Sequence, residues 1–208
     1  MVRTSRYCAQ MIAIRIFTGA DVAPHLEAVA ALRIAVFSEW PYLYSGDREY
    51  EQGYLATYAE STRSLFVLAF DGDVVVGAST GIPLADETAA FQQPFLDRGI
   101  GLDRVFYFGE SVLLPAYRGQ GLGHRFFDER EAHARRSGGF DLTAFCAVER
   151  RADDPRRPSG HRDNDAFWIR RGYQRQDDMF CQLEWQENDQ PWPSCHRLRF
   201  WLRPLGEP

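Results

Sequence analysis

The stretch LLPAYRGQGLG, residues 113–123, decides how this 208-residue chain folds. It follows an apolar run from Val105 to Leu114, which predicts a buried strand, and it leads into a pattern typical of an amphipathic helix. A strand that turns through alternating glycines into a helix leaves backbone N–H groups unpaired at the positive end of the helix dipole. We therefore expect this turn to bind an anion, with Arg118 adding a permanent positive charge for a pyrophosphate.

Other interpretations of the glycine turn fit less of the sequence. A P-loop would need Lys-Ser or Lys-Thr after the glycines, and neither follows. A dinucleotide-binding turn would place its third glycine where His124 stands, and its ribose-binding acid would have to be Glu149, which comes too late. A purely structural turn would need fewer glycines and no arginine. The dinucleotide interpretation keeps a nicotinamide-dependent oxidoreductase as one alternative function.

The rest of the chain predicts strands and helices in a mixed order. Asp71-Gly72-Asp73 separates two strand-like runs, which is typical of a β-hairpin. Because hairpins flank the glycine unit on both sides, we expect an α/β (α+β) fold with a mixed, mostly antiparallel central sheet and flanking helices. The predicted elements are a strand at 11–17, a helix from 21 to 37, an aromatic loop leading into a helix at 40–58, strands at 64–70 and 74–80, a long connection at 83–104, a strand at 105–114, a helix at 122–137, a strand at 142–148, a basic loop at 150–162, a short helix at 164–171 and a terminal hairpin at 181–202.

The helix after the glycine turn carries two kinds of side chain. Leu122, Phe126, Phe127 and Ala134 recur at the spacing of one buried face. The charged run at 128–136 is expected to lie mostly in solvent.

The glycine stretch resembles the signature motif of the GNAT superfamily of N-acetyltransferases, in which an apolar strand residue, a proline, an aromatic and Arg-Gly-x-Gly-x-Gly follow in this spacing. A second stretch, Asn164 with Ala166-Phe167-Trp168 and Gly172-Tyr173, is similar to that family's second signature. The resemblance covers roughly residues 11–203. It implies acetyl-CoA as the acyl donor and a GNAT-like sheet that splays at the signature strand.

Carried over residue by residue, the resemblance assigns the cofactor mainly to the main chain of the glycine stretch. The backbone of 118–123 would bind the pyrophosphate, and the splayed strand would offer its free backbone groups to the pantetheine arm. The asparagine of the second signature would contact the pantetheine or the adenosine side. The implied cofactor-binding residues are Val112, Leu113, Arg118, Gly119, Gln120, Gly121, Leu122, Gly123 and Asn164.

Direct attack of an amine on a thioester requires a base for the amine proton and a proton for the leaving thiolate. Glu110 is the candidate general base, because it interrupts an apolar strand close to the glycine stretch. Pairing with an arginine, or capping a bulge at Gly109, is the alternative role of that carboxylate. The general acid stays unassigned: the family's tyrosine position holds Phe167-Trp168, and Tyr173 and Cys146 are interpreted as core residues.

Two segments are candidates for the acceptor site. Residues 40–58 are rich in aromatic and acidic side chains, and their rings, with Asp47 or Glu49, would favour a positively charged amine; an aromatic-rich structural loop is the alternative. The arginines at 150–162 could hold a carboxylated acceptor or the 3′-phosphate of the cofactor. The aspartates among them make a self-neutralised surface the alternative there.

Composition narrows the partners and the compartment. The formal charge of −5 argues against a nucleic-acid surface, so a small molecule or peptide is the expected partner. No apolar run reaches the roughly 20 residues of a membrane span, and Met1 to Gln10 lack the apolar centre of a signal peptide, so we expect a cytoplasmic protein. The four cysteines form no Cys-x-x-Cys pair, so no metal site is expected.

Together these features predict one N-acetyltransferase domain over 1–208, with 1–10 as a disordered N-terminal extension. The expected function is transfer of the acetyl group of acetyl-CoA to a primary amine of a small molecule or peptide. A non-catalytic acyl-CoA-binding or sensing module, favoured only by the missing tyrosine, is the alternative from a different class. A homodimer through the terminal strands stays open.

Overall fold

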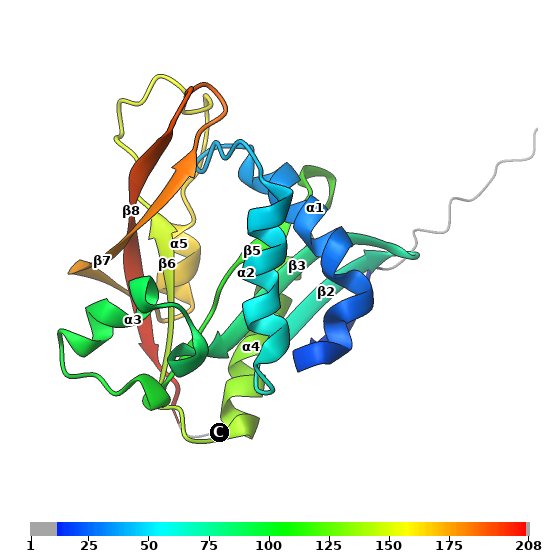
Figure 1. The fold of residues 1–208 in the computed structure, drawn as a ribbon, viewed down its shortest axis with the longest axis vertical. Coiled ribbons are helices and arrows are strands. Elements are labelled where there is room, and N and C mark those ends of the chain that lie inside the picture. Colours follow the sequence, from blue (N-terminus) through cyan, green and yellow to red (C-terminus); the bar gives the residue numbers. More distant parts are fainter. Residues whose placement is uncertain (1–11, 207–208) are drawn as a thin grey trace, which may run out of the picture.

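The chain folds into an open sheet with helices on both faces (Figure 1). The computed structural model describes residues 12–206, and the extension expected at 1–10 lies outside them. The strands are β1 Ala13–Thr18, β2 Leu65–Asp71, β3 Val74–Pro83, β4 Val105–Tyr107, β5 Ser111–Leu113, β6 Leu142–Val148, β7 Gln174–Gln186 and β8 Pro193–Pro204. The α-helices are α1 Leu26–Phe37, α2 Arg48–Glu60, α3 Ala89–Leu96, α4 Leu122–Ser137 and α5 Asp165–Arg170, and short 3-10 helices span Gly19–His25, Leu84–Asp86, Leu102–Arg104 and Pro115–Tyr117.

The sheet order is β1-β2-β3-β4-β6-β8-β7, with β5 paired to β3 beside this path. The β4–β6 pair is parallel, and the other pairs are antiparallel. This arrangement confirms the predicted mixed, mostly antiparallel sheet. It also does not suit the doubly wound parallel sheet that a dinucleotide-binding enzyme would need.

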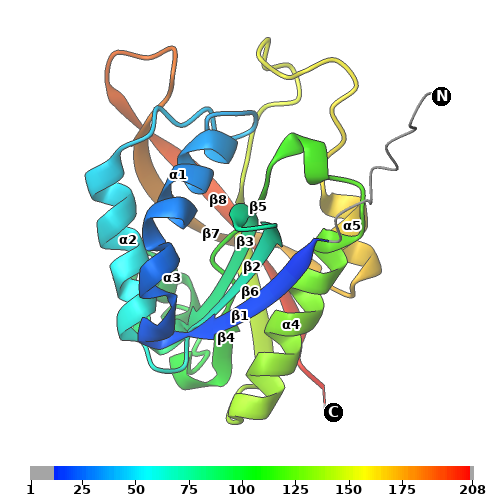
Figure 2. The ribbon, with the colours of Figure 1, turned by 90° about the vertical axis from the view of Figure 1, so that its right-hand side faces the viewer.

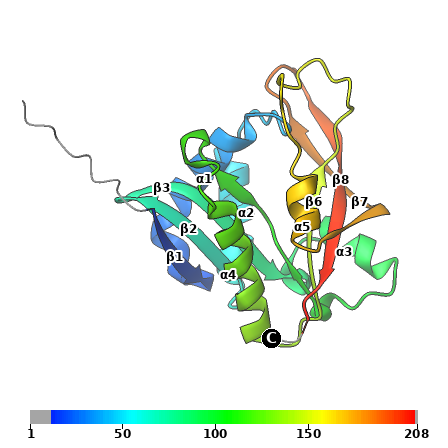
Figure 3. The ribbon, with the colours of Figure 1, turned by 180° about the vertical axis from the view of Figure 1, so that it is seen from behind.

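Helices α1 and α2 cover one face of the sheet, and α4 and α5 cover the other (Figures 2 and 3). Strand β2 shows how the sequence builds both layers, because all of its apolar side chains are buried. Phe66, Leu68 and Phe70 join the cluster that contains side chains of α1 and α2. Leu65, Val67 and Ala69 join the cluster that contains side chains of α4, as the two-residue repeat of a strand requires.

The strand predicted at 105–114 is interrupted. Its two halves, β4 and β5, are separated by a β-bulge in which Gly109 N donates to Thr80 O (3.2 Å) and Glu110 O accepts from Thr80 N (3.1 Å). A Cβ at Gly109 would fall 2.6 Å from Thr80 Oγ1 and closer still to the Tyr58 hydroxyl, so only glycine fits there. Phe108 N still bonds Ala144 O of β6 (2.8 Å), whereas β5 pairs with β3 alone. The sheet therefore opens between β5 and β6.

Two expectations about the remaining chain hold only in part. The connection at 83–104 contains α3 and two short 3-10 helices. In the charged run of α4, Arg130 and Glu131 are buried. Arg130 lies one turn after Phe126 on the inner face, and its guanidinium carbon sits 4.1 Å from the centroid of the Phe108 ring.

Candidate active site

A cavity of about 560 Å³ occupies the opening between β5 and β6. One wall is the bulge and β5, and the other is the second half of β6. The start of α4 and helix α5 border it from the α4–α5 face of the sheet. Lining residues include Glu110, Ser111, Leu113, Gly123, Phe145 and Asn164.

The bulge decides which backbone groups of β5 face this cavity. In an antiparallel pair, one residue directs both its N–H and its C=O to the same side, and the side alternates along the strand. Glu110 O accepts from β3, and Leu114 N donates to Val76 O of β3 (3.0 Å), so Val112 between them also faces β3. Ser111 and Leu113 therefore face the opening. Of the two strand residues predicted to offer their backbone to the pantetheine, the alternation favours Leu113.

The glycine loop at the end of β5 has the geometry of an anion site. Gly119 and Gly121 have φ angles of 77° and 81°, which side-chain-bearing residues rarely adopt. Within residues 12–206, no hydrogen-bond acceptor is found for the N–H groups of five consecutive residues, Gly119, Gln120, Gly121, Leu122 and Gly123. Gly121 is also the N-cap of α4, so these donors lie at the positive end of a 16-residue helix.

Arg118, expected to bind a pyrophosphate with its side chain, instead contacts two protein groups. Its Nε donates to Leu113 O (3.0 Å), and its Nη2 pairs with Glu39 Oε2 (2.8 Å), just after the end of α1. Its guanidinium is thus engaged by protein groups on both sides. The loop's free hydrogen-bonding capacity lies in its main chain.

Asn164 lies at the mouth of the cavity, where it is exposed and precedes α5. Its carbonyl accepts from Phe167 N (2.9 Å) and Trp168 N (3.0 Å), which leaves the side-chain amide available to a ligand. Tyr173, in contrast, is buried and shares a 3.0 Å hydrogen bond with Thr143 Oγ1 in the core, as interpreted from the sequence.

Glu110 is buried, and its two carboxylate oxygens differ. Oε2 lies 2.6 Å from Arg33 Nη1 and 3.1 Å from the hydroxyl of Tyr54. Oε1 is buried and has no hydrogen-bond partner in the part of the chain that the structure describes. The arginine pairing weighed as an alternative role is therefore real, and it still leaves one oxygen available to a donor.

Glu110 belongs to a buried polar network that joins α1, α2 and the bulge. Arg33 bonds Glu51 as well as Glu110. The Tyr54 hydroxyl lies 3.0 Å from that of Tyr58, which donates to Glu87 (2.7 Å). Burial raises the pKa of Glu51 against the opposing effect of Arg33, and burial also raises the pKa of the Glu87 carboxyl.

A second cavity, of about 90 Å³, lies on the α1–α2 side of the bulge. Phe37, Tyr42, Gly109, Glu110 and Cys146 line both cavities, so the two meet at the bulge. The aromatic segment at 40–58 does line this second cavity, through side chains from both its loop and its helix. Its aromatic lining includes Tyr42, Tyr44, Tyr50, Tyr54, Tyr107 and Trp185.

The acids of this cavity are not those predicted. Asp47 caps α2, accepting from Glu49 N (2.8 Å) and Tyr50 N (3.0 Å), and neither Asp47 nor Glu49 lines the cavity. Glu51 and Glu110 do. The signal in the sequence was the helical spacing of Glu51, Tyr54 and Tyr58, which puts all three on one face of α2.

Arg33 and Arg130 were also missed. Arg33 is a single charge in the apolar run of α1, and such a residue is buried only when it has partners. Arg130 donates through Nη1 to Thr80 O (3.4 Å) and Glu110 O (3.3 Å), so it stabilises the bulge from the α4 side. Burial lowers its pKa to about 10.

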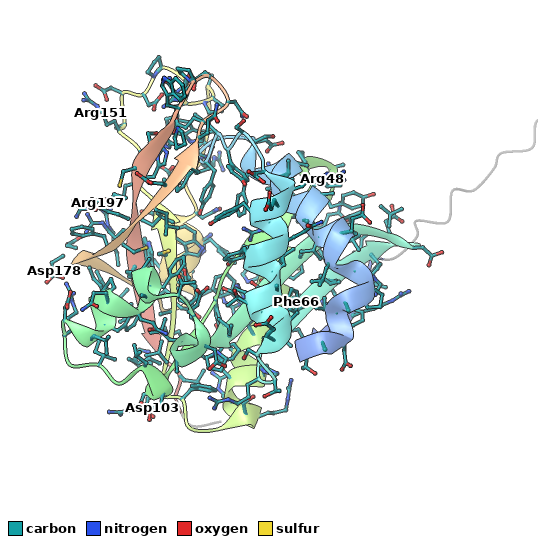
Figure 4. The ribbon with its side chains drawn as sticks, in the orientation of Figure 1. Arg48, Phe66, Asp103, Arg151, Asp178 and Arg197 are labelled. Carbon is teal, nitrogen blue, oxygen red and sulfur yellow. The ribbon has the colours of Figure 1, made fainter. Side chains whose placement is uncertain are left out.

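The arginine loop after β6 is largely self-neutralised. Arg151 pairs with Asp153, Arg156 with Asp154 and Glu187, and Arg157 with Asp163. Arg151 lies at the outer end of the molecule (Figure 4). This loop therefore offers fewer free cations than its composition suggests.

Two further observations concern metal ions and membranes. Between residues 12 and 206, no group of three or more His, Cys, Asp or Glu side chains is arranged to hold a metal ion. Over the same residues, no helix is long and apolar enough to cross a membrane.

Known proteins share this architecture. The N-acetyltransferase of Staphylococcus aureus Mu50 aligns with a TM-score of 0.59 at 11% identity, covering 94% of this chain and 99% of that chain. The YncA protein of Salmonella typhimurium, solved with its cofactor acetyl-CoA, aligns with a TM-score of 0.53 at 16% identity, covering 95% of each chain. NAA60 of Arabidopsis thaliana, in complex with acetyl-CoA, aligns with a TM-score of 0.57 at 14% identity, covering 93% of this chain and 98% of that chain. At these identities the likeness shows the fold.

Sequence comparison identifies the family. No curated protein sequence matches the chain. The sequence model described as "Acetyltransferase (GNAT) family" matches residues 31–158, which include the second half of α1, all of α2, the hairpin, the bulge, the glycine loop and β6. The chain therefore belongs to the GNAT family of acetyltransferases.

Proposed function

We propose that this protein transfers the acetyl group of acetyl-CoA to a primary amine of a small molecule or peptide by direct attack. Membership of the family makes the chain an acetyl-CoA-dependent acyltransferase, with acetyl-CoA as cosubstrate. The observation that carries the proposal is the run of five unpartnered N–H groups beside a strand that has left its neighbour. The loop N–H groups can donate to the pyrophosphate of the cofactor, and the free backbone groups of β5 can pair with the amides of its pantetheine arm.

The residues present fit acetyl-CoA. The N–H groups of 119–123 would hold the pyrophosphate, and Ser111 and Leu113 would pair with the pantetheine amides. Leu113 O already accepts from Arg118, which leaves its N–H as the freer group. Asn164, at the mouth of the same cavity, would contact the pantetheine or the adenosine side.

The proposed reaction takes place at the bulge, where the two cavities meet. The amine nitrogen attacks the carbonyl carbon of the thioester, the C–N bond forms, and the C–S bond breaks. Glu110 Oε1 accepts the proton that the amine loses. The thiolate of CoA leaves with the electron pair of the C–S bond and takes its proton from solvent. Tyr42 and Cys146 border the junction, but burial raises the pKa values of both side chains and makes them weak acids.

We further propose that residues 1–208 form one domain. Its support is that the structures described above cover 93 to 95% of this chain with a single fold.

The test combines binding with turnover. We expect calorimetric titration to detect acetyl-CoA and CoA but not NADH, and a thiol-release assay with a panel of primary amines to detect CoA formation. Binding without turnover of any amine would leave a non-catalytic acyl-CoA-binding module as the function. Binding of NADH alone would contradict the proposal entirely.

A further inference from the structure

The smaller cavity carries information about the acceptor. It lies between α1, α2 and the bulge on one side and residues of β6, β7 and β8 on the other, and its lining includes Tyr50, which is 52% exposed. Its volume of about 90 Å³ is well below the roughly 300–1,000 Å³ of pockets for drug-sized ligands. The cavity therefore fits a slender, unbranched molecule.

Two atoms in this cavity require a hydrogen-bond donor. Glu110 Oε1 and Glu51 Oε1 are both buried, and neither has a partner among residues 12–206. Their side chains are 3% and 1% exposed, so water has little access to them. A buried carboxylate oxygen without a donor is costly, and the donor expected of a ligand here is a charged N–H group.

The two carboxylates lie on opposite sides of one guanidinium. Arg33 bonds Glu51 through Nε and Glu110 through Nη1. Because the guanidinium stands between the two carboxylates, we assign each unpartnered oxygen a donor group of its own. A ligand that satisfies both needs two donor groups joined by a short chain.

Charge and ring chemistry agree with this requirement. Arg33 pairs with Glu51 and Glu110, and Glu87 joins the same buried network through Tyr58 and Tyr54, so the network holds three carboxyl groups and one arginine. Arg130, on the opposite side of the bulge, contacts only the main chain of Glu110. Tyrosine rings line most of the remaining wall, and ring faces attract cations.

We propose that the acceptor is a short, unbranched diamine. One amino group lies at Glu110, where the reaction takes place, and the second stays charged beside Glu51 with its alkyl chain among the tyrosine rings. A carboxylate in place of the second amine is rejected, because Arg33 is already paired twice and the pocket is negative. This assignment rests on the proposed function and adds the class of substrate to it.

The test compares three acceptors of matched length in the thiol-release assay with acetyl-CoA: 1,4-diaminobutane, butylamine and 4-aminobutanoate. We expect kcat/KM for the diamine to exceed that for butylamine by about 10- to 100-fold, as for one hydrogen bond to a charged group. We expect 4-aminobutanoate to be the slowest. An equal or faster rate for butylamine or for 4-aminobutanoate would overturn the diamine assignment.

Two variants locate the second amine. Glu51→Gln should lower the diamine-to-butylamine ratio toward one, whereas Glu49→Gln, two residues earlier on the exposed face of α2, should leave the ratio unchanged. If Glu51→Gln folds and the diamine-to-butylamine ratio is unchanged, the second amine does not lie at Glu51. If this variant fails to fold, the comparison of the three acceptors with the wild type still decides the substrate class. Turnover of other amines with no preference for the diamine would contradict only this inference. Failure to bind acetyl-CoA would contradict the proposed function itself.

Discussion

The glycine loop and the tyrosine-lined cavity lie on either side of one bulge, and they offer opposite hydrogen-bonding groups to a ligand: donors in the loop and acceptors in the cavity. The loop offers five main-chain donors from consecutive residues, so it requires an anion. The cavity offers two unpartnered carboxylate oxygens from α2 and the bulge, so it requires a cation. The difference explains how one strand break can bring an anionic cofactor and a cationic amine together without either occupying the other's site.

The largest expected effect is the loss of cofactor binding when a charge enters the loop. Gly121→Asp adds an anion beside the five donors. The φ angle of 81° strains any residue with a side chain, but a Cβ here meets no atom within 4 Å, so we expect a local strain that the fold survives. We expect the dissociation constant for acetyl-CoA to rise at least about 100-fold, or roughly 2.7 kcal/mol, in calorimetric titration.

Gly99→Asp is the matched control for this variant. Gly99 also has a positive φ angle, of 66°, and open space around its Cβ position, but it lies after α3, away from both cavities. It should bind acetyl-CoA like the wild type. Undiminished binding by Gly121→Asp would show that the loop does not hold the pyrophosphate.

The next effect separates catalysis from binding at the bulge. Glu110→Gln keeps the shape of the side chain but cannot accept the amine proton, so we expect kcat to fall by about 100-fold or more. The dissociation constant for acetyl-CoA should change less than about twofold, because the loop donors are untouched. A loss of acetyl-CoA affinity with kcat preserved would reverse these roles for Glu110.

Stability should distinguish the two regions as well. Arg33→Met leaves two buried carboxylates without their cation, which is expected to cost about 3–5 kcal/mol of the free energy of unfolding. Arg118→Met removes a half-exposed pair with Glu39 and an exposed hydrogen bond to Leu113 O, and it should cost about 1 kcal/mol. Urea unfolding of both variants is the measurement, and equal losses would contradict the contrast.

The smallest effect concerns pH and the helix that carries the loop. Burial lowers the pKa of His133, whose Nε2 lies 2.9 Å from Arg63 O. The folded state therefore binds this proton less tightly than the unfolded state, and stability is lost as pH falls below about 6.5. Between pH 7.5 and 5.5, we expect the wild type to lose more of its free energy of unfolding than His133→Gln in urea unfolding. Parallel losses would show that His133 does not contribute.

The contrast between the regions also explains which parts were predictable from sequence. The loop could be predicted because its donors and glycines are consecutive, so spacing alone carries the information. The hairpin around Gly72 and the strand at 142–148 were predicted for the same reason, since each depends on local pattern.

The acceptor side could not be predicted because its pairs are distant in the chain. Arg33 meets Glu110 only after α1 packs on the sheet, and Gly109 is required by Tyr58 and Thr80, which come from other elements. Gly109 and Glu110 interrupt the apolar run 105–114 and left a bulge open as an alternative, but the run alone does not show that β5 leaves β6 there. The burial of Arg130 depends likewise on rings that its neighbours in sequence do not reveal.

The central claim is that the loop's main chain binds the pyrophosphate of the cofactor, and one binding cycle tests it most directly. The measurement is the ratio of dissociation constants for S-acetylpantetheine, which lacks the pyrophosphate and the 3′-phosphoadenosine attached to it, and acetyl-CoA, in the wild type and in Gly121→Asp. The account predicts a ratio above about 100 in the wild type, or at least roughly 2.7 kcal/mol, that falls to within a few-fold of one in the variant. A ratio that the substitution leaves unchanged would place the pyrophosphate elsewhere and contradict the account.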